Sequence, residues 1–308
     1  MPPAKILQPG EIESLASPIT QLRLPDPHIF LHRAERLHRV AQGHSIGDYL
    51  RFVGSIAERQ QELLDSIVDL EVPDFEPTGH LELGPRPLPA AGWPRDPRWR
   101  DLARALAKAV MPDAPTPAQM VLNALCGQSD DWLEGQADAL IGLDLGRLDI
   151  AASPILAGAL QVYWTRLART QDPARIPRPE DAGLCPICGS HPIVSLVQLG
   201  GDVNALRYLV CSLCGSQWHL ERAKCSSCGN TRDIGYQTVE NPNSAIRAES
   251  CPECHGYLKI LYRNQMPDLE PTADDLASLA LDWLMSDEGY ARTGVNLMLL
   301  QGSIDAAG

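Results

Sequence analysis

The sequence is poor in basic residues, aromatic residues and long uncharged apolar stretches. It contains 26 Lys and Arg against 39 Asp and Glu among 308 residues, which gives a formal net charge of −13. Binding to a nucleic acid depends on Lys and Arg that neutralise phosphates, so this shortage argues against a polyanionic partner. We therefore expect no nucleic-acid partner.

No eighteen apolar residues follow one another without a charge, and the opening stretch MPPAKILQPGEIESL has neither a basic end nor an apolar run. A membrane span needs such a run, and a secretory signal needs both features. We expect a protein with no membrane span in the cytoplasm. In that reducing compartment, cysteines persist as thiols or as metal ligands.

Cysteine is the residue in which the chain is rich, and eight of its nine cysteines form four CxxC pairs. Advancing the first four of these cysteines by forty positions gives the other four. Gly189, Ala205 and Arg207 also map onto Gly229, Ala245 and Arg247 in this register. An internal duplication of a C-x2-C-x22-C-x2-C unit explains the match. The two quartets are Cys185, Cys188, Cys211, Cys214 and Cys225, Cys228, Cys251, Cys254.

Each duplicated unit should carry its own tetra-cysteine metal site, because two CxxC knuckles can clasp one tetrahedral ion. The rival is a crossed arrangement that unites the first and third pairs. Sulfur-only coordination suits zinc and mononuclear iron alike, so the residues leave the metal open. His191, His219 and His255 lie near knuckles, but four thiolates already saturate a tetrahedral ion. We expect none of these histidines to be a ligand.

The fold class that the pattern predicts is α+β and multidomain. Residues 1–170 have helical apolar spacing punctuated by proline, and residues 171–184 contain three prolines and no periodicity. We expect an all-helical domain over 1–170, a linker over 171–184, and rubredoxin-like or zinc-ribbon modules over 185–222 and 223–265. A C-terminal helical segment over 266–308 should contain one amphipathic helix, with Leu276, Leu279 and Trp283 on its apolar face, and a second short helix over 295–302.

The stretch QWHLERAK joins the two modules as a short tether. Trp218 and Arg222 within it are candidates for meeting a partner or for setting the geometry between the modules, since Trp and Arg are favoured at interfaces. Packing for the tryptophan and a solvated charge for the arginine are the simpler interpretation.

The segments CPICGSHP, RYLVCSLCGSQWHLERAKCSSCG and AESCPECHGYLK resemble the FdhE family of formate dehydrogenase accessory proteins. The stretches LRLPDPHIFLHRAERLHRVAQGHSIGDYLRFV and DDLASLALDWL are similar to that family too. The resemblance implies a cytoplasmic protein, not itself an enzyme, that binds the catalytic subunit of a respiratory formate dehydrogenase during its assembly or activation. It also favours iron in the two tetra-cysteine sites, and it supplies no catalytic residue.

Two other functions fit the cysteine pattern. The first is a zinc-ribbon protein that binds nucleic acid, which a salt-dependent affinity for DNA or RNA would reveal. The second is an iron redox protein of rubredoxin type, which a visible absorption that bleaches reversibly on reduction would reveal.

Overall fold

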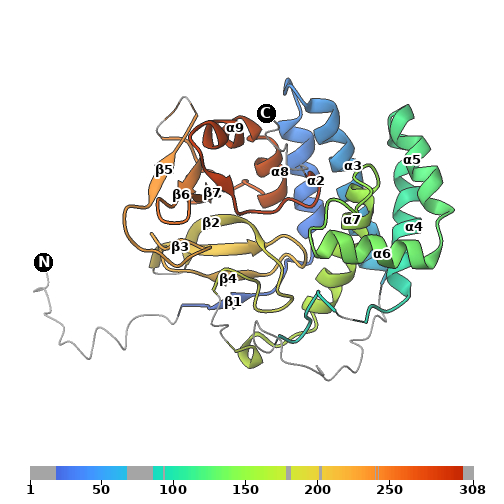
Figure 1. Ribbon diagram of the computed structural model, residues 1–308, viewed down its shortest axis with the longest axis horizontal. Helices are drawn as coiled ribbons and strands as arrows, with labels where there is room; N and C mark the ends of the chain where they lie inside the picture. Colours follow the sequence, from blue (N-terminus) through green and yellow to red (C-terminus); the bar gives the residue numbers. More distant parts are fainter. Residues whose placement is uncertain are drawn as a thin grey trace, which may run out of the picture.

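The structure is a mixed arrangement of helices and one sheet, and the helices lie beside the sheet and over part of it (Figure 1). It is a computed structural model that describes residues 19–67, 86–92, 94–177, 182–200, 203–239, 241 and 243–300. Within these residues, no helix is both long and apolar enough to cross a membrane.

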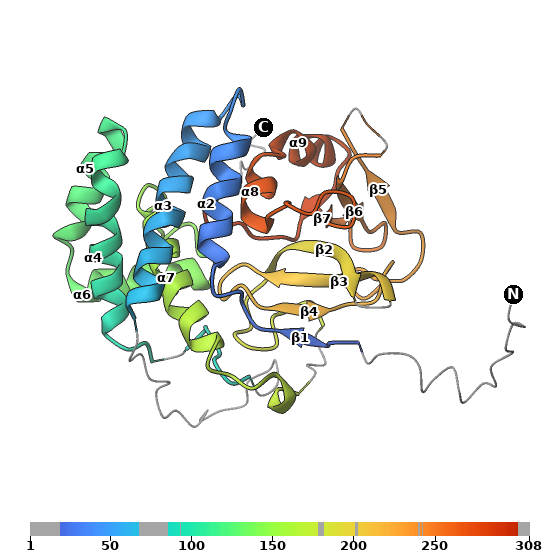
Figure 2. The same ribbon diagram turned by 180° about the vertical axis from the view of Figure 1, so that it is seen from behind.

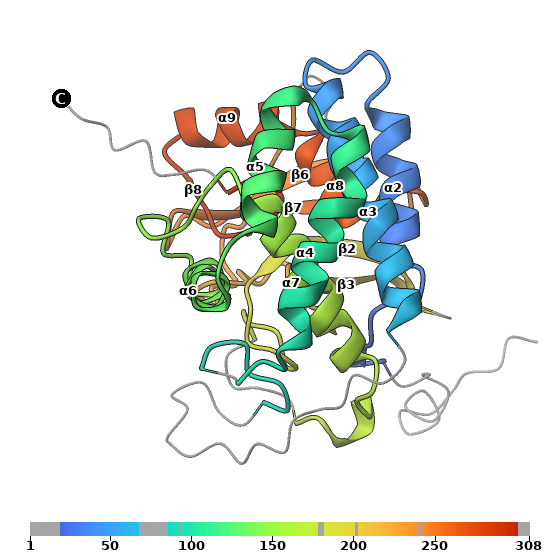
Figure 3. The same ribbon diagram turned by 90° about the vertical axis from the view of Figure 1, so that its right-hand side faces the viewer.

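The helices of the first part of the chain pack around α7, which is buried along nearly its whole length. Figure 3 shows α3 and α4 against it. The apolar stripe of α4 faces inward as its spacing predicts, with Trp99, Leu106 and Val110 fully buried. Proline occupies the first turn of both α5 and α7, where its missing N–H costs nothing.

The helices are α2 (Ile29–Val40), α3 (Gly47–Ser66), α4 (Arg98–Val110), α5 (Thr116–Cys126), α6 (Asp130–Ile141), α7 (Ser153–Ala168), α8 (Pro271–Leu276) and α9 (Leu279–Asp287), with 3-10 turns η1 (Met111–Asp113) and η2 (Pro173–Arg175).

The strands form one sheet in the order β1-β4-β3-β2-β7-β6-β5, and β8 pairs with β7. They are β1 (Leu22–Arg23), β2 (Pro192–Gly200), β3 (Val203–Cys211), β4 (Gln217–His219), β5 (Gly235–Gln237), β6 (Ile246–Ser250), β7 (Gly256–Tyr262) and β8 (Ala291–Arg292). Strands β2, β3, β5 and β6 lie between the two knuckles of their units, and β4 and β7 each follow the second knuckle.

The sheet consists of two copies of one antiparallel unit. The first copy is β2-β3-β4 and the second is β5-β6-β7. They join side by side, because β2 of the first copy pairs in parallel with β7 of the second, with Leu196 opposite Leu261. The duplication in the sequence is therefore a duplication in the fold, and the two copies share a continuous hydrogen-bonded sheet.

The expectation of an all-helical N-terminal part was wrong at β1. Figure 2 shows this short strand along the edge of the sheet beside β4. Leu22 pairs with Trp218 and Arg23 with Gln217. An edge strand presents unpaired N–H and C=O groups, and the extended stretch before α2 pairs with them while the Leu22 side chain is buried.

The C-terminal segment is also less helical than expected. Its predicted amphipathic helix is broken into α8 and α9 at Ser278, whose backbone is not helical and whose hydroxyl donates to the carbonyls of Asp274 and Asp275. Trp283 is 78% exposed and does not lie on an apolar face. Among residues 295–300 no helix forms, and the segment instead contributes β8 just before them.

Candidate metal centres

Each tetra-cysteine cluster is built from two tight turns at the ends of strands in its unit. In the first turn of each cluster, the backbone N–H of the first cysteine donates to the carbonyl of the residue five positions later in the chain. Cys185 donates to Ser190, and Cys225 donates to Asn230. The glycine that follows the CxxC pair lies in the left-handed region at Gly189, Gly215 and Gly229, with φ of +79°, +74° and +75°. Glycine adopts this conformation without steric cost, so these turns follow from the CxxCG sequence.

The fourth turn departs from glycine and keeps the same backbone shape. His255 occupies the equivalent place with φ of +52°. Histidine is one of the non-glycine residues that enter the left-handed region more often. The histidine therefore leaves the geometry of the fourth knuckle intact.

The structure groups the sulfur atoms as the repeat predicts, and the crossed arrangement does not occur. We call Cys185, Cys188, Cys211 and Cys214 cluster 1, and Cys225, Cys228, Cys251 and Cys254 cluster 2. In each cluster the four sulfur atoms lie within 4.8 Å of one another.

The spacing of the sulfur atoms fits a tetrahedral ion. In cluster 1, the Sγ atoms of Cys185 and Cys214 are 3.6 Å apart, and those of Cys188 and Cys211 are 3.4 Å apart. The corresponding pairs in cluster 2 are 3.7 and 3.6 Å apart. Thiolates at about 2.3 Å from a tetrahedral ion are about 3.8 Å from one another. A disulfide would need about 2.05 Å. Both clusters could therefore bind a metal ion.

Among the described residues, the two clusters contain cysteines alone. His219 lies edge-on to Tyr208, with ring centroids 5.8 Å apart. His255 lies beside Tyr290, at 6.0 Å between ring centroids. His191 lines a cavity beside Cys188 of cluster 1 and a second cavity that reaches Ser226 and Ser227 in the first knuckle of cluster 2. The structure thus places no histidine with the sulfur atoms.

The cysteine thiols differ in acidity because their burial and their hydrogen bonds differ. Burial raises the pKa values of the Cys185 and Cys211 thiols well above the ordinary value. Burial opposes ionisation of Cys251 too, but hydrogen bonds from the Cys254 amide and the Asn230 side chain outweigh it and lower the pKa of its thiol to about 6. Binding of a divalent ion to such a cluster must release the protons of the remaining thiols.

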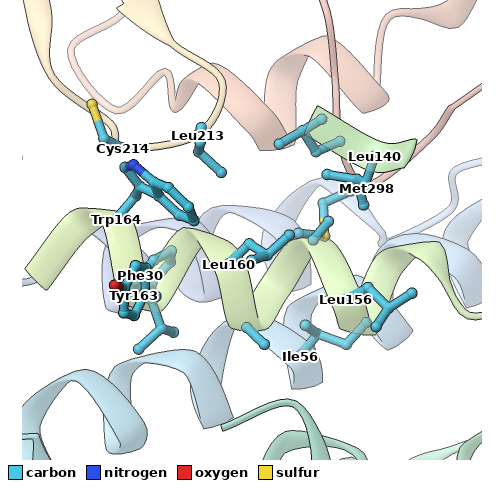
Figure 4. Packing of buried hydrophobic residues seen from close by; sticks show 14 of the residues in the cluster. Phe30, Ile56, Leu140, Leu156, Leu160, Tyr163, Trp164, Leu213, Cys214 and Met298 are labelled. Atoms are coloured by element: carbon cyan, nitrogen blue, oxygen red, sulfur yellow. The ribbon is translucent and has the colours of Figure 1, made fainter. Parts of the chain in front are cut away.

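Cluster 1 lies inside the main hydrophobic core, with all four cysteines at most 3% exposed. Figure 4 shows Trp164 of α7 next to Cys214. The Thr165 hydroxyl donates to the Cys214 carbonyl at 3.4 Å, and the Gln161 amide donates to the Ser212 carbonyl at 2.8 Å. The knuckle is thereby tied to the central helix of the helical body.

Two serine hydroxyls also lie against the sulfur atoms of cluster 1. Ser190 Oγ is 3.5 Å from Cys188 Sγ, and Ser216 Oγ is 3.2 Å from Cys214 Sγ. Such neighbours orient a ligand and adjust its electron density. The sequence carries a signal for them, since both knuckles of this unit read CxxCGS.

Cluster 2 lies at the surface of the sheet's second unit. Cys228 and Cys254, one from each knuckle, are exposed, whereas Cys225 and Cys251 are 7% and 2% exposed. The side-chain amide of Asn230 donates to Cys251 Sγ at 3.6 Å. Asn230 takes the place that Ser190 has in the first unit.

The tether between the clusters is held by a residue that sequence reasoning missed. Arg207 of β3 is 1% exposed, and its guanidinium donates to the carbonyls of Glu221 and Lys224 at 3.3 and 2.6 Å. It also forms an ion pair of 2.7 Å with Glu249 of β6, in the second unit. Arg207 belongs to the forty-residue repeat of the sequence, but the repeat does not indicate that this side chain contacts both units.

The two tether residues proposed as partner contacts lie in different surroundings. Trp218 is 4% exposed, and its indole N–H donates to the Ala182 carbonyl at 2.8 Å. Its ring edge lines a cavity of about 460 Å³. Arg222 is exposed at the surface of the tether.

Three family models cover most of the chain. "FdhE, N-terminal" matches residues 19–180, "FdhE, central domain" matches 184–222, and "FdhE, C-terminal domain" matches 223–299. The chain is 40% identical over 277 residues to "Protein FdhE homolog" of Serratia proteamaculans, and the match covers 89% of each chain.

The chain belongs to the FdhE family.

Further relatives agree with this assignment. "Protein FdhE" of Salmonella arizonae is 39% identical over 277 residues, again with 89% of each chain covered. The crystal structure of the FdhE protein from Pseudomonas aeruginosa is similar with a TM-score of 0.77 at 34% identity, and the match covers 92% of this chain and all of that one. The arrangement of helices and sheet in this chain is therefore similar to that of a solved FdhE structure over most of its length.

Proposed function

We propose that this protein is an accessory factor for a respiratory formate dehydrogenase, that it acts in the cytoplasm without catalysing a reaction, and that it binds the catalytic subunit of that enzyme. Membership in the FdhE family along nearly the whole chain carries this proposal. The intact pair of tetra-cysteine clusters supports it, because both clusters keep the geometry that a metal ion requires.

The eight cysteines of the two clusters are proposed to hold one metal ion each, with iron favoured and zinc the alternative. Four thiolates around one ion suit both metals. When bound, the ion would cross-link the two knuckles of its unit and so stabilise their turns. Within the chain, the backbone amides of Leu213 and Cys214 donate to Cys211 Sγ at 3.4 and 3.3 Å, which would help to hold the thiolate against the burial that raises the pKa of this thiol.

The contact with the catalytic subunit is proposed to lie on the exposed side of the tether, around Arg222. The Arg222 guanidinium is exposed and can reach a partner. Trp218 is buried and could contribute only where it lines the neighbouring cavity. Exposed arginines are frequent anchors of interfaces.

Co-purification tests the proposal directly. The tagged protein should retain the catalytic subunit when both are expressed in a host that lacks its own FdhE relative, and formate dehydrogenase activity should return in that host. The double variant Cys228→Ser/Cys254→Ser should lose this activity while it remains folded by circular dichroism. Cys126→Ser is the matched control, because Cys126 is the one described cysteine outside both clusters.

Retained activity and binding in a variant that lacks all eight cluster cysteines would contradict the role of the metal. Activity restored without any association with the catalytic subunit would contradict the proposed partner. Metal analysis and a visible spectrum of protein prepared without oxygen would separate iron from zinc.

A further inference from the structure

We infer that the two clusters have different tasks: cluster 1 is a permanent structural centre, and cluster 2 is an exchangeable one whose ion can leave or be transferred while the protein stays folded. The inference rests on the proposed function, because it requires that both clusters bind metal. The inference goes beyond the proposed function in two ways. It assigns metal exchange to cluster 2 alone, and it names a thiolate donor as the class of molecule that would take the ion.

The segment 86–90 encloses the first knuckle of cluster 1. The Arg86 guanidinium donates from Nε to the Cys185 carbonyl at 3.0 Å, and the Arg86 side chain lies over Gly189, where its Cδ would be 3.3 Å from an added Cβ. The amides of Leu88 and Ala90 donate to the carbonyls of Ile187 and Cys188 at 3.1 and 2.8 Å. The segment 86–90 thus runs along this knuckle as a hydrogen-bonded cover.

The second knuckle of cluster 1 is enclosed by helices. Gln161 and Thr165 of α7 bond to its carbonyls, as described above, and Leu213 is packed in the main core. Ile29 at the start of α2 lies so close to Gly215 that an added Cβ would be 2.5 Å from its Cδ1. A cavity of about 200 Å³ borders Cys188 and Leu213, but the four cysteines themselves are at most 3% exposed. An incoming ligand could therefore reach the ion only if the packing around the knuckles opened, and such sub-global opening is rare.

Cluster 2 has an open edge. Cys228 and Cys254 are exposed and belong to different knuckles, so solvent meets a ligand from each side of the site. Gly229 is the counterpart of Gly189 in the second unit. A Cβ added at Gly229 would have Lys224 Cε as its nearest atom, at 3.9 Å, and this atom lies near the end of a flexible and partly exposed side chain. At the second knuckle, the Ala291 amide of β8 donates to the His255 carbonyl at 2.8 Å. These contacts hold the turns without covering the exposed thiols.

Ligand exchange at a tetra-thiolate site proceeds when an incoming donor binds the ion as one cysteine leaves. Soft ions such as zinc and iron accept sulfur donors readily, so a thiolate from another molecule can replace an exposed cysteine. The open edge of cluster 2 permits this step with only local movement of the Cys228 and Cys254 turns. Cluster 1 would first require part of the core to open.

The full-length protein loaded with two equivalents of Zn²⁺ provides the test. A chelating dye in excess should remove one equivalent at least about tenfold faster than the other, because only one site is accessible without opening of the core. Added glutathione, as a thiolate donor, should accelerate the fast phase and leave the slow phase unchanged. The double variant Cys228→Ser/Cys254→Ser should bind one equivalent, stay folded and release it only in the slow phase.

A second pair of variants tests the cause of the difference. Arg86→Ala removes part of the cover over cluster 1 and should accelerate the slow phase alone. Lys224→Ala is the matched control at the corresponding place in the second unit and should change neither phase by more than about twofold, since an exposed side chain contributes little there.

The outcomes separate the inference from the proposal on which it rests. Release of both equivalents at one rate, or loss of the slow phase in the Cys228→Ser/Cys254→Ser variant, would overturn the division of tasks while leaving two metal sites in place. Failure of the protein to bind two equivalents of metal would overturn the proposed function first and the inference with it.

Discussion

Arg207 should be the residue whose loss most weakens the connection between the two units of the sheet. Its side chain is 1% exposed and donates to Ser195 Oγ at 2.8 Å in addition to the two tether carbonyls and the Glu249 carboxylate. Arg207→Met keeps much of the volume and removes all of these contacts. The change leaves the Glu249 carboxylate buried without its cation and two carbonyls without their donor.

The magnitude follows from these losses. Removal of one member of a buried ion pair costs about 3–5 kcal/mol of the free energy of unfolding. The two tether carbonyls add about 1 kcal/mol each if water does not replace the guanidinium. Because the tether loop lies near the surface, we expect water to reach these carbonyls and the total to stay at about 4 kcal/mol.

The other partner should behave differently. Burial raises the pKa of Glu249, although the Arg207 charge opposes the shift, so the ionised carboxyl is less favourable in the folded state than in the unfolded one. Stability therefore falls as the pH rises through the range between the unfolded and folded pKa values. Glu249→Gln, which mimics the protonated form, should cost less than about 1 kcal/mol at neutral pH because of this raised pKa. The double variant should be more stable than Arg207→Met alone.

Urea unfolding of the four proteins at pH 7 and pH 5 measures these terms in a double-mutant cycle. Hydrogen exchange of the 217–225 region should accelerate in Arg207→Met, while α7 remains protected. The reasoning fails if Arg207→Met costs less than about 0.5 kcal/mol, or if Glu249→Gln costs as much as Arg207→Met, since neither result fits a buried and unequal pair.

Three further predictions concern stability. Burial opposes ionisation of Asp275, but the charges of Lys259 and Arg292 outweigh it and lower the pKa of its carboxyl. The stabilisation of the folded state by this carboxylate is present above the unfolded pKa of about 3.9 and is lost as the pH falls further. Asp275→Asn should therefore cost about 3 kcal/mol at pH 7 and flatten the acid limb of a plot of stability against pH. In thermal unfolding of the metal-loaded protein, Gly215→Ala should cost about 1–2 kcal/mol more than Gly229→Ala: the two residues share a left-handed φ, but only the first meets a side chain at 2.5 Å. Trp283→Ser should change the free energy of urea unfolding by less than about 0.5 kcal/mol, because the ring is 78% exposed; a larger loss would mean that α9 packs differently.

The sequence predicted the grouping of the cysteines well because the turns that position them are local. A CxxCG turn specifies its own backbone, and the forty-residue register specified which turns meet, so the grouping of Cys185 with Cys214 followed from arithmetic. The helical stripe of α4 was equally readable, since Trp99 and Val110 lie on one face. In these places a short-range pattern determines the structure.

The errors lie where distant segments decide the structure. Leu22 and Arg23 form a strand only because β4 offers an edge, and no residue near them signals that. The break between α8 and α9 is a local exception, because it lies at the non-helical backbone of Ser278 within a continuous apolar pattern. The parallel contact of β2 with β7 joins residues more than sixty positions apart, and neither strand indicates its partner.

The difference between the two clusters also explains why the repeat departs from glycine at its fourth knuckle. At Gly215 the start of α2 lies against the turn, and any Cβ would collide with Ile29 in addition to the strain of a left-handed residue. At His255 the turn faces solvent, so a side chain fits and the remaining cost is the modest one of the left-handed conformation. The enclosed unit therefore requires glycine at this turn, whereas the exposed unit tolerates a side chain. The histidine at the fourth knuckle is consistent with the same exposure that leaves Cys254 at the surface.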